Sequence, residues 1–372
     1  MKIGIWGYYG FDNFGDDLIL ETLLEWIYEI DDKSKTYVFI EKDEKEEILD
    51  RFPNTYQRQR TVKTALKMAM QELDVLLIGG GGIFPASTST RLGFYYLLSM
   101  IMKIRRKKVA CIGVGVEEKN LLHKSNRLLL NKLISTVDFF SIREGQLRED
   151  KAILPIKNEK EVIPTADIVF SRIPNTNVRI ENRFNVFLAD IFDIFPNIDY
   201  ELFEDNIVSI INHILEEGYE VCLIPFTNQK DQKLNDRIAL RISSDRCFSM
   251  PYCKDINAIL DEISKGSFSL CMRFHAIVVS MLYEIPMCSI SYGDKSSKLM
   301  NRINLQQFNS NFGDNNGSEK YFHNIQVDSV LEQIDSMISN RKAIVDMLRP
   351  EREKLRQESL RNRELLESVI RG

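Results

Sequence analysis

Short apolar runs that end in glycine or polar residues alternate with helical patterns along most of the chain. The run Val75–Ile78 is followed directly by glycines, and the run Lys2–Gly7 precedes a helical segment. This alternation is typical of βα units, in which crossover helices join parallel strands. The pattern therefore predicts an α/β fold built on parallel sheets.

The alternation passes through two cycles. The first predicts strands at Lys2–Gly7, Thr36–Ile40, Val75–Ile78, Lys108–Val114 and Phe139–Ile142. The second predicts strands at Phe184–Leu188, Glu220–Ile224, Phe248–Met250, Phe268–Met272 and Met287–Ile290. Two doubly wound, Rossmann-like domains that face a cleft would bind a ligand at the carboxyl ends of their strands.

The domain boundaries follow from a polar stretch with a proline and no hydrophobic period, at 171–177. We expect an N-terminal Rossmann-like domain over 1–172, a linker over 173–182 and a C-terminal Rossmann-like domain over 183–335. The remaining tail, 336–372, is helical in pattern, and Pro350 is expected to break it. Its interspersed charges predict a solvated helix face.

Composition excludes several classes of protein. A chain of 372 residues that is 44% hydrophobic and 28% charged suits two ordinary globular domains. A net charge of -5 argues against a nucleic-acid partner. The six cysteines form no CxxC pair or zinc pattern, so we expect no metal site, and the four that lie in apolar runs are expected to be buried as small apolar residues.

The sequence also predicts a cytoplasmic protein. Its first residues enter a strand rather than a signal-peptide core. The longest apolar stretch, Leu92–Met102, falls short of the roughly 20 residues that a membrane span needs. Any membrane association would then be peripheral, at the inner face.

Two glycine loops are candidate binding elements. The first, Gly7–Asp17, follows the first strand and includes Gly10, Gly15 and Asp16. Its glycines permit close approach of a ligand and the next helix offers N–H groups to an anion, but turning of the chain with Asp16 or Asp17 as helix cap explains them equally well. The second loop follows Val75–Ile78 and contains Gly80, Gly81 and Gly82. So many successive glycines favour a backbone surface that a ligand touches.

Basic residues at predicted strand ends suggest an anion site. His275 lies at a strand-to-helix junction and could donate or accept a proton, although a single histidine is more often structural. Arg273 precedes it, Arg143 follows Phe139–Ile142 and Lys295 follows Met287–Ile290. Three cations at three strand ends would together bind a carboxylate or a phosphate.

These motifs resemble the polysaccharide pyruvyl transferase family in sequence and order. Gly7–Asp17 is similar to the opening motif of the family, with Asp17 in place of glutamate, and Ile78–Gly82 is similar to its glycine run, without the Gln-Asp that often follows. The other matching segments, in chain order, are Ile112–Val116, Ser141–Glu144, Thr165–Asp167, Met272–Ala276, Ile285-Pro286 and Ser291–Lys295.

The resemblance implies a GT-B-like fold and a phosphoenolpyruvate-dependent transferase that places a pyruvyl ketal on a sugar of a surface or extracellular polysaccharide or its precursor. It implies His275 as the catalytic residue, Arg143, Arg273 and Lys295 in the phosphoenolpyruvate pocket, and no cofactor. A further family arginine, also expected to bind phosphoenolpyruvate, corresponds to Arg60 or equally to Arg58. The acceptor saccharide, free or lipid-linked, would lie on the N-terminal side, with loops such as Phe84–Arg91 setting its specificity.

Three alternatives remain open from the sequence. A GT-B glycosyltransferase would use the same fold with a nucleotide sugar, and a sugar-nucleotide epimerase would share it. A saccharide-binding or assembly protein could keep the fold without the chemistry. The segment Phe187–Phe192 lacks the arginine that often follows this strand in the family, so acceptor handling could differ.

Overall fold

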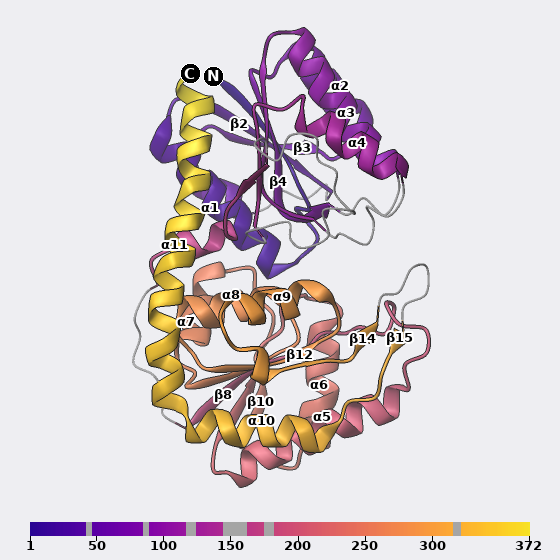
Figure 1. Ribbon diagram of the computed structural model, residues 1–372, viewed down its shortest axis with the longest axis vertical. Helices are drawn as coiled ribbons and strands as arrows, with labels where there is room; N and C mark the ends of the chain where they lie inside the picture. The colour runs from indigo at the N-terminus through magenta and orange to yellow at the C-terminus, as the bar shows by residue number, and fades with distance from the viewer. Residues whose placement is uncertain (42–46, 85–88, 117–123, 144–161, 175–181, 315–320) are drawn as a thin grey trace. The chain divides into compact units, whose positions relative to one another are not determined.

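The computed structural model describes residues 1–41, 47–84, 89–116, 124–143, 162–174, 182–314 and 321–372 (Figure 1). The chain divides into two compact units: residues 1–172 with 355–372, and residues 173–354. Three sequence-based predictions fall wholly or partly outside the described residues: Glu144, the linker 173–182 and the loop Phe84–Arg91. Each unit is described by itself below.

The first unit is built on a seven-stranded sheet whose strands are all parallel, in the order β3-β2-β1-β4-β5-β6-β7. The strands are β1 (Lys2–Trp6), β2 (Lys35–Ile40), β3 (Thr55–Gln59), β4 (Val75–Phe84), β5 (Lys108–Val116), β6 (Phe139–Ile142) and β7 (Val162–Pro164). The chain adds strands on one side of β1, then returns to place β4 on its other side. This reversal makes the gap between β1 and β4 the topological switch point of the sheet.

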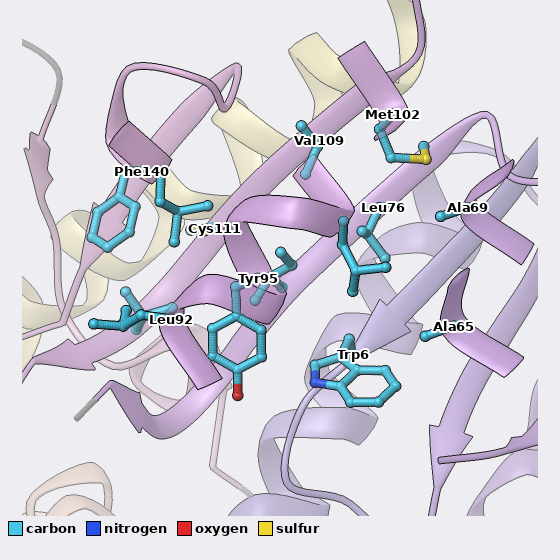
Figure 2. Close-up of a cluster of buried hydrophobic side chains, with 14 of the residues drawn as sticks. Trp6, Ala65, Ala69, Leu76, Leu92, Tyr95, Met102, Val109, Cys111 and Phe140 are labelled. Atoms are coloured by element: carbon cyan, nitrogen blue, oxygen red, sulfur yellow. The ribbon is translucent and has the colours of Figure 1, made fainter. Parts of the chain in front are cut away.

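Helices cover both faces of this sheet (Figure 1). On one face lie α2 (Val62–Gln71), α3 (Ser89–Ile104) and α4 (Lys124–Ile134), which pack with the strands in the apolar cluster that Figure 2 shows. On the other lie α1 (Phe14–Ile30), the short helix η4 (Ile168–Ser171) and the end of α11 (Arg341–Arg371). A further short helix, η1 (Glu47–Arg51), precedes β3.

The second unit has a six-stranded parallel sheet in the order β10-β9-β8-β11-β12-β13. Its strands are β8 (Arg183–Phe187), β9 (Glu220–Leu223), β10 (Cys247–Ser249), β11 (Phe268–Cys271), β12 (Met287–Ser291) and β13 (Asn309–Asn311). Here the switch point lies between β8 and β11. Two doubly wound parallel-sheet domains are thus confirmed.

The helices of this unit are α5 (Tyr200–Glu216), α6 (Asp231–Arg241), α7 (Ile256–Ser264), α8 (Phe274–Leu282), α9 (Asp294–Arg302), η5 (Gln306–Phe308) and α10 (Val327–Ser339). A small antiparallel pair, β14 (Gly313–Asp314) and β15 (Tyr321–Phe322), accompanies the sheet. At the amino edge of the sheet, Glu262 of α7 forms an ion pair with Arg183 of β8. It forms a second ion pair with Lys265, in which Oε2 of Glu262 lies 2.5 Å from Nζ of Lys265.

The C-terminal tail differs from the prediction. The interruption falls at Asn340, between α10 and α11, and α11 runs through Pro350 without ending. Its last turns belong to the first unit, where the buried Asn362 accepts a hydrogen bond from Ser141 (2.6 Å) and donates one to Ala166 (3.1 Å). The helix continues past the proline because buried residues such as Leu348 and Leu355 hold both sides of it against the protein.

All six cysteines are free, and five of them are buried, as expected for small apolar residues. Cys253 is the partly exposed one. Among the residues that the structure describes, no helix has the length and apolar character needed to cross a membrane.

Candidate functional site

The candidate site of the second unit lies at the carboxyl edge of its sheet. Arg273 lies two residues after the end of β11 and occupies the N-cap position of α8, which places it beside the switch point. Its guanidinium Nη2 donates to Asp231 Oδ1. Asp231 begins α6, two strands away in the sheet, and is fully buried. The pair therefore joins the segments that follow β9 and β11.

Asp231 also organises the surrounding backbone. Its Oδ1 accepts the N–H of Asp190 at 3.2 Å and its Oδ2 accepts the N–H of Phe226 at 3.3 Å. Burial disfavours the charged form of Arg273, yet its pKa is raised because the acidic groups of Asp231, Tyr292 and Asp190 lie around it. The guanidinium is thus held in place, and charged, by a buried carboxylate.

Phe274 connects the other two predicted residues of this edge. The rings of Phe274 and His275 form an edge-to-face pair with centroids 5.3 Å apart, in the first turn of α8. The Nζ atom of Lys295, in the first turn of α9, lies 5.9 Å from the centroid of the Phe274 ring. The Nε2 atom of His275 is shielded from solvent. The structure therefore brings Arg273, His275 and Lys295 to one edge.

Sequence reasoning missed several residues at this edge, notably Asp231, Asp190, Tyr292 and Lys230. The Lys230 ammonium pairs with Asp193 at 2.6 Å, and this hydrogen bond raises its pKa, as does the charge of Asp190, whereas the charge of Arg273 lowers it. A signal was present for Asp231, since it begins a helical pattern shortly after a strand. Its role could not be read from spacing because its partner is 42 residues away.

The glycine loops of the first unit pack against each other at the switch point between β1 and β4. The hydroxyl of Tyr9, a fully buried residue, donates to the Gly79 carbonyl at 2.6 Å. Burial, followed by the charges of Asp16 and Asp17, raises the pKa of Tyr9, so the phenol stays protonated and able to donate.

The neighbours of the glycine run explain two of its glycines. A Cβ on Gly80 would lie 2.4 Å from the Tyr9 hydroxyl, and one on Gly81 would lie 2.6 Å from Asp16 Oδ1. Both residues have positive φ, at +77° and +90°. Gly82 is exposed, and its nearest neighbour would be Arg143 Nη2 at 3.7 Å. The need for glycine at 80 and 81 therefore comes from the protein itself and does not identify a ligand surface.

The start of α1 differs from the prediction that Asp16 or Asp17 caps it. The helix begins at Phe14, and Asn13 is the N-cap, with Oδ1 accepting from Gly15 N–H at 3.1 Å. Gly15 and Asp16 are buried in its first turn. Gly10 has a φ of +82° and packs against Ile40, so a tight turn requires glycine there.

Arg143 belongs to the first unit, and two of the sequence motifs meet at it. Its Nη1 donates to Asp167 Oδ2 at 2.9 Å, and both side chains are almost fully buried. Asp167 also caps η4 by accepting the Val169 N–H at 3.1 Å. The structure does not place this arginine in one unit with Arg273 and Lys295, so a pocket containing all three stays a prediction.

The two candidate arginines, Arg58 in β3 and Arg60 directly after it, have different surroundings. Arg58 lies over the Tyr37 ring, 4.7 Å from its centroid, and donates to the Gln57 carbonyl. Arg60 donates from Nε to the carbonyl of Gly7, in the first glycine loop, at 2.9 Å. Arg60 therefore contacts the first glycine loop, and the functional role of either arginine stays a prediction.

One group in the described part of the chain has a geometry that could hold a metal ion. The ligand atoms of His213, Glu217 and Asp335 lie within 4.8 Å of one another. His213 Nε2 is already 2.7 Å from Asp335 Oδ1. The group sits at the end of α5, just before β9, and so at the amino edge of the sheet rather than at the candidate site.

Comparison with known proteins gives a family and a fold. A sequence model of the family described as polysaccharide pyruvyl transferase matches residues 13–294. A solved UDP-N-acetylglucosamine 2-epimerase is 12% identical with a TM-score of 0.60, over 99% of this chain and 95% of that one. A putative epimerase of the same kind from Listeria monocytogenes is 10% identical with a TM-score of 0.60, over 94% and 90%.

The UDP-N-acetylglucosamine 2-epimerase from Neisseria meningitidis, solved with UDP-N-acetylglucosamine bound, is 11% identical with a TM-score of 0.59, over 98% of this chain and 99% of that one. Identities this low show the fold alone, which is of the GT-B type. No curated protein matches the chain.

Proposed function

Since this chain belongs to the polysaccharide pyruvyl transferase family, we propose that it transfers the pyruvyl group of phosphoenolpyruvate to a saccharide as a ketal and releases phosphate. The saccharide would belong to a surface or extracellular polysaccharide or its precursor. We further propose that the enzyme is cytoplasmic, either free or bound peripherally to the membrane. The proposed reaction requires no metal or nucleotide cofactor.

The observation that carries the proposal is the arrangement at the carboxyl edge of the second sheet. Arg273, oriented by Asp231, precedes the first turn of α8 with His275, and Lys295 lies across the Phe274 ring. Phosphoenolpyruvate carries a carboxylate and a phosphate on one enol carbon. A fixed guanidinium and an ammonium suit two such anions, and a histidine beside them suits proton transfer.

The reaction then runs in two additions. Protonation of the methylene carbon gives an oxocarbenium-like carbon, and a sugar hydroxyl attacks it and loses its proton. The C–O bond to phosphate breaks, and a second hydroxyl of the same sugar attacks and loses its proton to close the ketal. One of the two released protons replaces the one added to the methylene carbon, and the other leaves with phosphate. His275 would deliver the first proton or remove a hydroxyl proton.

The donor is tested by titrating the protein with phosphoenolpyruvate in a calorimeter, beside UDP-N-acetylglucosamine and other nucleotide sugars. We expect phosphoenolpyruvate to bind, and Arg273→Ala to weaken it by about 10- to 100-fold, because one charge-assisted contact contributes about 1.5–3 kcal/mol. Binding of a nucleotide sugar without binding of phosphoenolpyruvate would favour a glycosyltransferase or an epimerase instead.

The role of His275 is tested by turnover. We expect His275→Ala to lower the rate of saccharide-dependent phosphate release by about 10²–10⁴-fold while phosphoenolpyruvate still binds, since general acid–base groups contribute that much. His213→Ala is the matched control, because that histidine lies at the other edge of the same sheet. A His275 variant that keeps most of its activity would contradict the assignment.

A further inference from the structure

Two aromatic rings are stacked at the carboxyl edge of the first unit's sheet, in the loop after β1. The rings of Tyr8 and Phe11 have centroids 3.9 Å apart and planes inclined by 5°. Tyr8 is 42% exposed, whereas the adjacent Tyr9 is fully buried. Ligands of open α/β sheets bind at this edge, next to the switch point. An aromatic pair kept at the surface there suggests a binding role.

A cation lies close to this pair. The Cζ atom of Arg60 is 5.7 Å from the centroid of Phe11 and 5.0 Å from that of the buried Trp6. Arg60 is therefore close both to Trp6, which is buried, and to Phe11, which stacks on the exposed Tyr8. We call these four residues the aromatic ladder.

The loop that carries the ladder is held at three points. Gly7 accepts a hydrogen bond from Arg60 Nε at 2.9 Å, Tyr9 donates its hydroxyl to Gly79 at 2.6 Å, and the Tyr9 carbonyl accepts the N–H of Glu41 at 3.4 Å. The Tyr9 side chain is fixed in the core, whereas the side chain of the preceding residue, Tyr8, is exposed to solvent. A ring fixed in this way loses little conformational freedom when a ligand stacks on it.

The chemistry of the ladder's outer end suits a sugar ring. An aromatic face is electron-rich and attracts the C–H groups on the apolar face of a pyranose, but it does not attract an anion such as phosphoenolpyruvate. The hydroxyl groups at the edge of the sugar ring need polar partners. Glu41, whose side chain is 51% exposed and lies 3.4 Å from Arg60 Nη1, offers a carboxylate next to this loop.

We propose that Tyr8 is the stacking platform for the acceptor saccharide and that Arg60 is the residue that positions it. The proposal rests on the proposed function, and it places an acceptor contact on the first glycine loop. Under it, the contacts of Arg60 with Trp6, Phe11 and Gly7 orient the loop, so the loss of Arg60 acts on acceptor affinity through Tyr8.

The test is saturation-transfer NMR on the full chain, with and without saturating phosphoenolpyruvate. The probes are the methyl glycosides of glucose, galactose, mannose and their 2-acetamido forms. We expect transfer to the ring C–H protons of at least one glycoside. Tyr8→Ala should weaken its binding by about tenfold, because stacking on one aromatic ring contributes about 0.5–1.5 kcal/mol beyond area burial. Tyr8→Phe keeps the ring and should bind within about threefold of the original protein.

Tyr28→Ala is the matched control, since Tyr28 is 44% exposed on α1 and lies away from the loop. This variant should bind like the original protein. UMP serves as the nucleotide control probe. Absence of transfer to every glycoside, an unchanged affinity in Tyr8→Ala, or transfer to UMP instead of the glycosides would each overturn the platform.

The phosphoenolpyruvate titration separates the platform from the proposed function. If phosphoenolpyruvate binds but Tyr8→Ala does not affect the glycosides, the platform is wrong and the function stands. If glycoside binding is lost in Tyr8→Ala while phosphoenolpyruvate never binds, the platform stands and the function is wrong.

Discussion

Replacing Asp231 by asparagine turns one oxygen of a buried carboxylate into an NH2 group and leaves the side chain nearly the same size. In the structure both oxygens accept hydrogen bonds: Oδ1 from Arg273 and from the backbone N–H of Asp190, and Oδ2 from the N–H of Phe226. Whichever way the asparagine amide is turned, its NH2 group faces an N–H donor. The substitution therefore removes a charge and creates a donor–donor contact in the core.

The expected cost follows from these contacts. A hydrogen bond to a charged group contributes about 1.5–3 kcal/mol, and removing one partner of a buried ion pair costs about 3–5 kcal/mol. The Arg273 side chain is 20% exposed, so water can partly solvate the remaining charge. We expect the free energy of unfolding of the second unit to fall by about 2–4 kcal/mol. For a unit of roughly 180 residues this lowers Tm by roughly 5–15 °C.

The assay is calorimetric unfolding of the full chain, followed by phosphoenolpyruvate titration of the folded variant. Asp205→Asn is the matched control, because its ion pair with Arg241 is exposed and should change stability by about 0–1 kcal/mol. If Asp231 orients Arg273, Asp231→Asn and Arg273→Ala should weaken phosphoenolpyruvate binding non-additively in a double-mutant cycle. A loss of stability no larger than that of the control would refute this account of the pair.

Two further predictions concern the glycine run and the response to acid. Gly81→Ala should destabilise the first unit, since φ is +90° there and a Cβ would lie 2.6 Å from Asp16 Oδ1. Gly82→Ala should be tolerated, and thermal unfolding of both variants checks this prediction. Burial opposes the charged form of Glu262, yet its pKa is lowered by its two cationic partners. The unfolded state then binds more protons, so stability is lost as pH falls below the ordinary glutamate pKa of about 4.3. Tm measured against pH should fall less steeply on the acid side in Glu262→Gln, and an unchanged slope would contradict the role of this pair.

The sequence predicted those elements whose residues are buried on both sides of the sheet, because continuous apolar runs are distinctive. The strand β3 was missed since its residues, Thr55–Gln59, are polar and partly exposed at the sheet edge. The three-residue strand β7 is too short to show a pattern. The helix through Pro350 was missed because tertiary packing overrides the local preference of proline.

The candidate site was predictable as a set of positions but not as a set of contacts. Arg273, His275 and Lys295 follow strands, and parallel strands bring their carboxyl ends to one edge. Nothing in the spacing indicates that Asp231 pairs with Arg273, because this contact depends on which strands become neighbours. Asn362 was equally invisible: in a charged tail it looks solvated, yet it is fully buried.

The two arginine–aspartate pairs change how the cations of this protein should be understood. Arg143 with Asp167, and Arg273 with Asp231, are each close to neutral as a pair, and each aspartate also accepts backbone N–H groups. Such an arginine contributes directed N–H donors rather than net charge. Net positive charge at the carboxyl edge of the second unit's sheet must then come from exposed cations such as Lys295. Attraction of an anion to an exposed ammonium is screened by salt, whereas orientation by a guanidinium that a buried aspartate holds is screened much less. Salt should therefore weaken phosphoenolpyruvate binding mainly through Lys295, and Arg273→Lys would lose the geometry while keeping the charge.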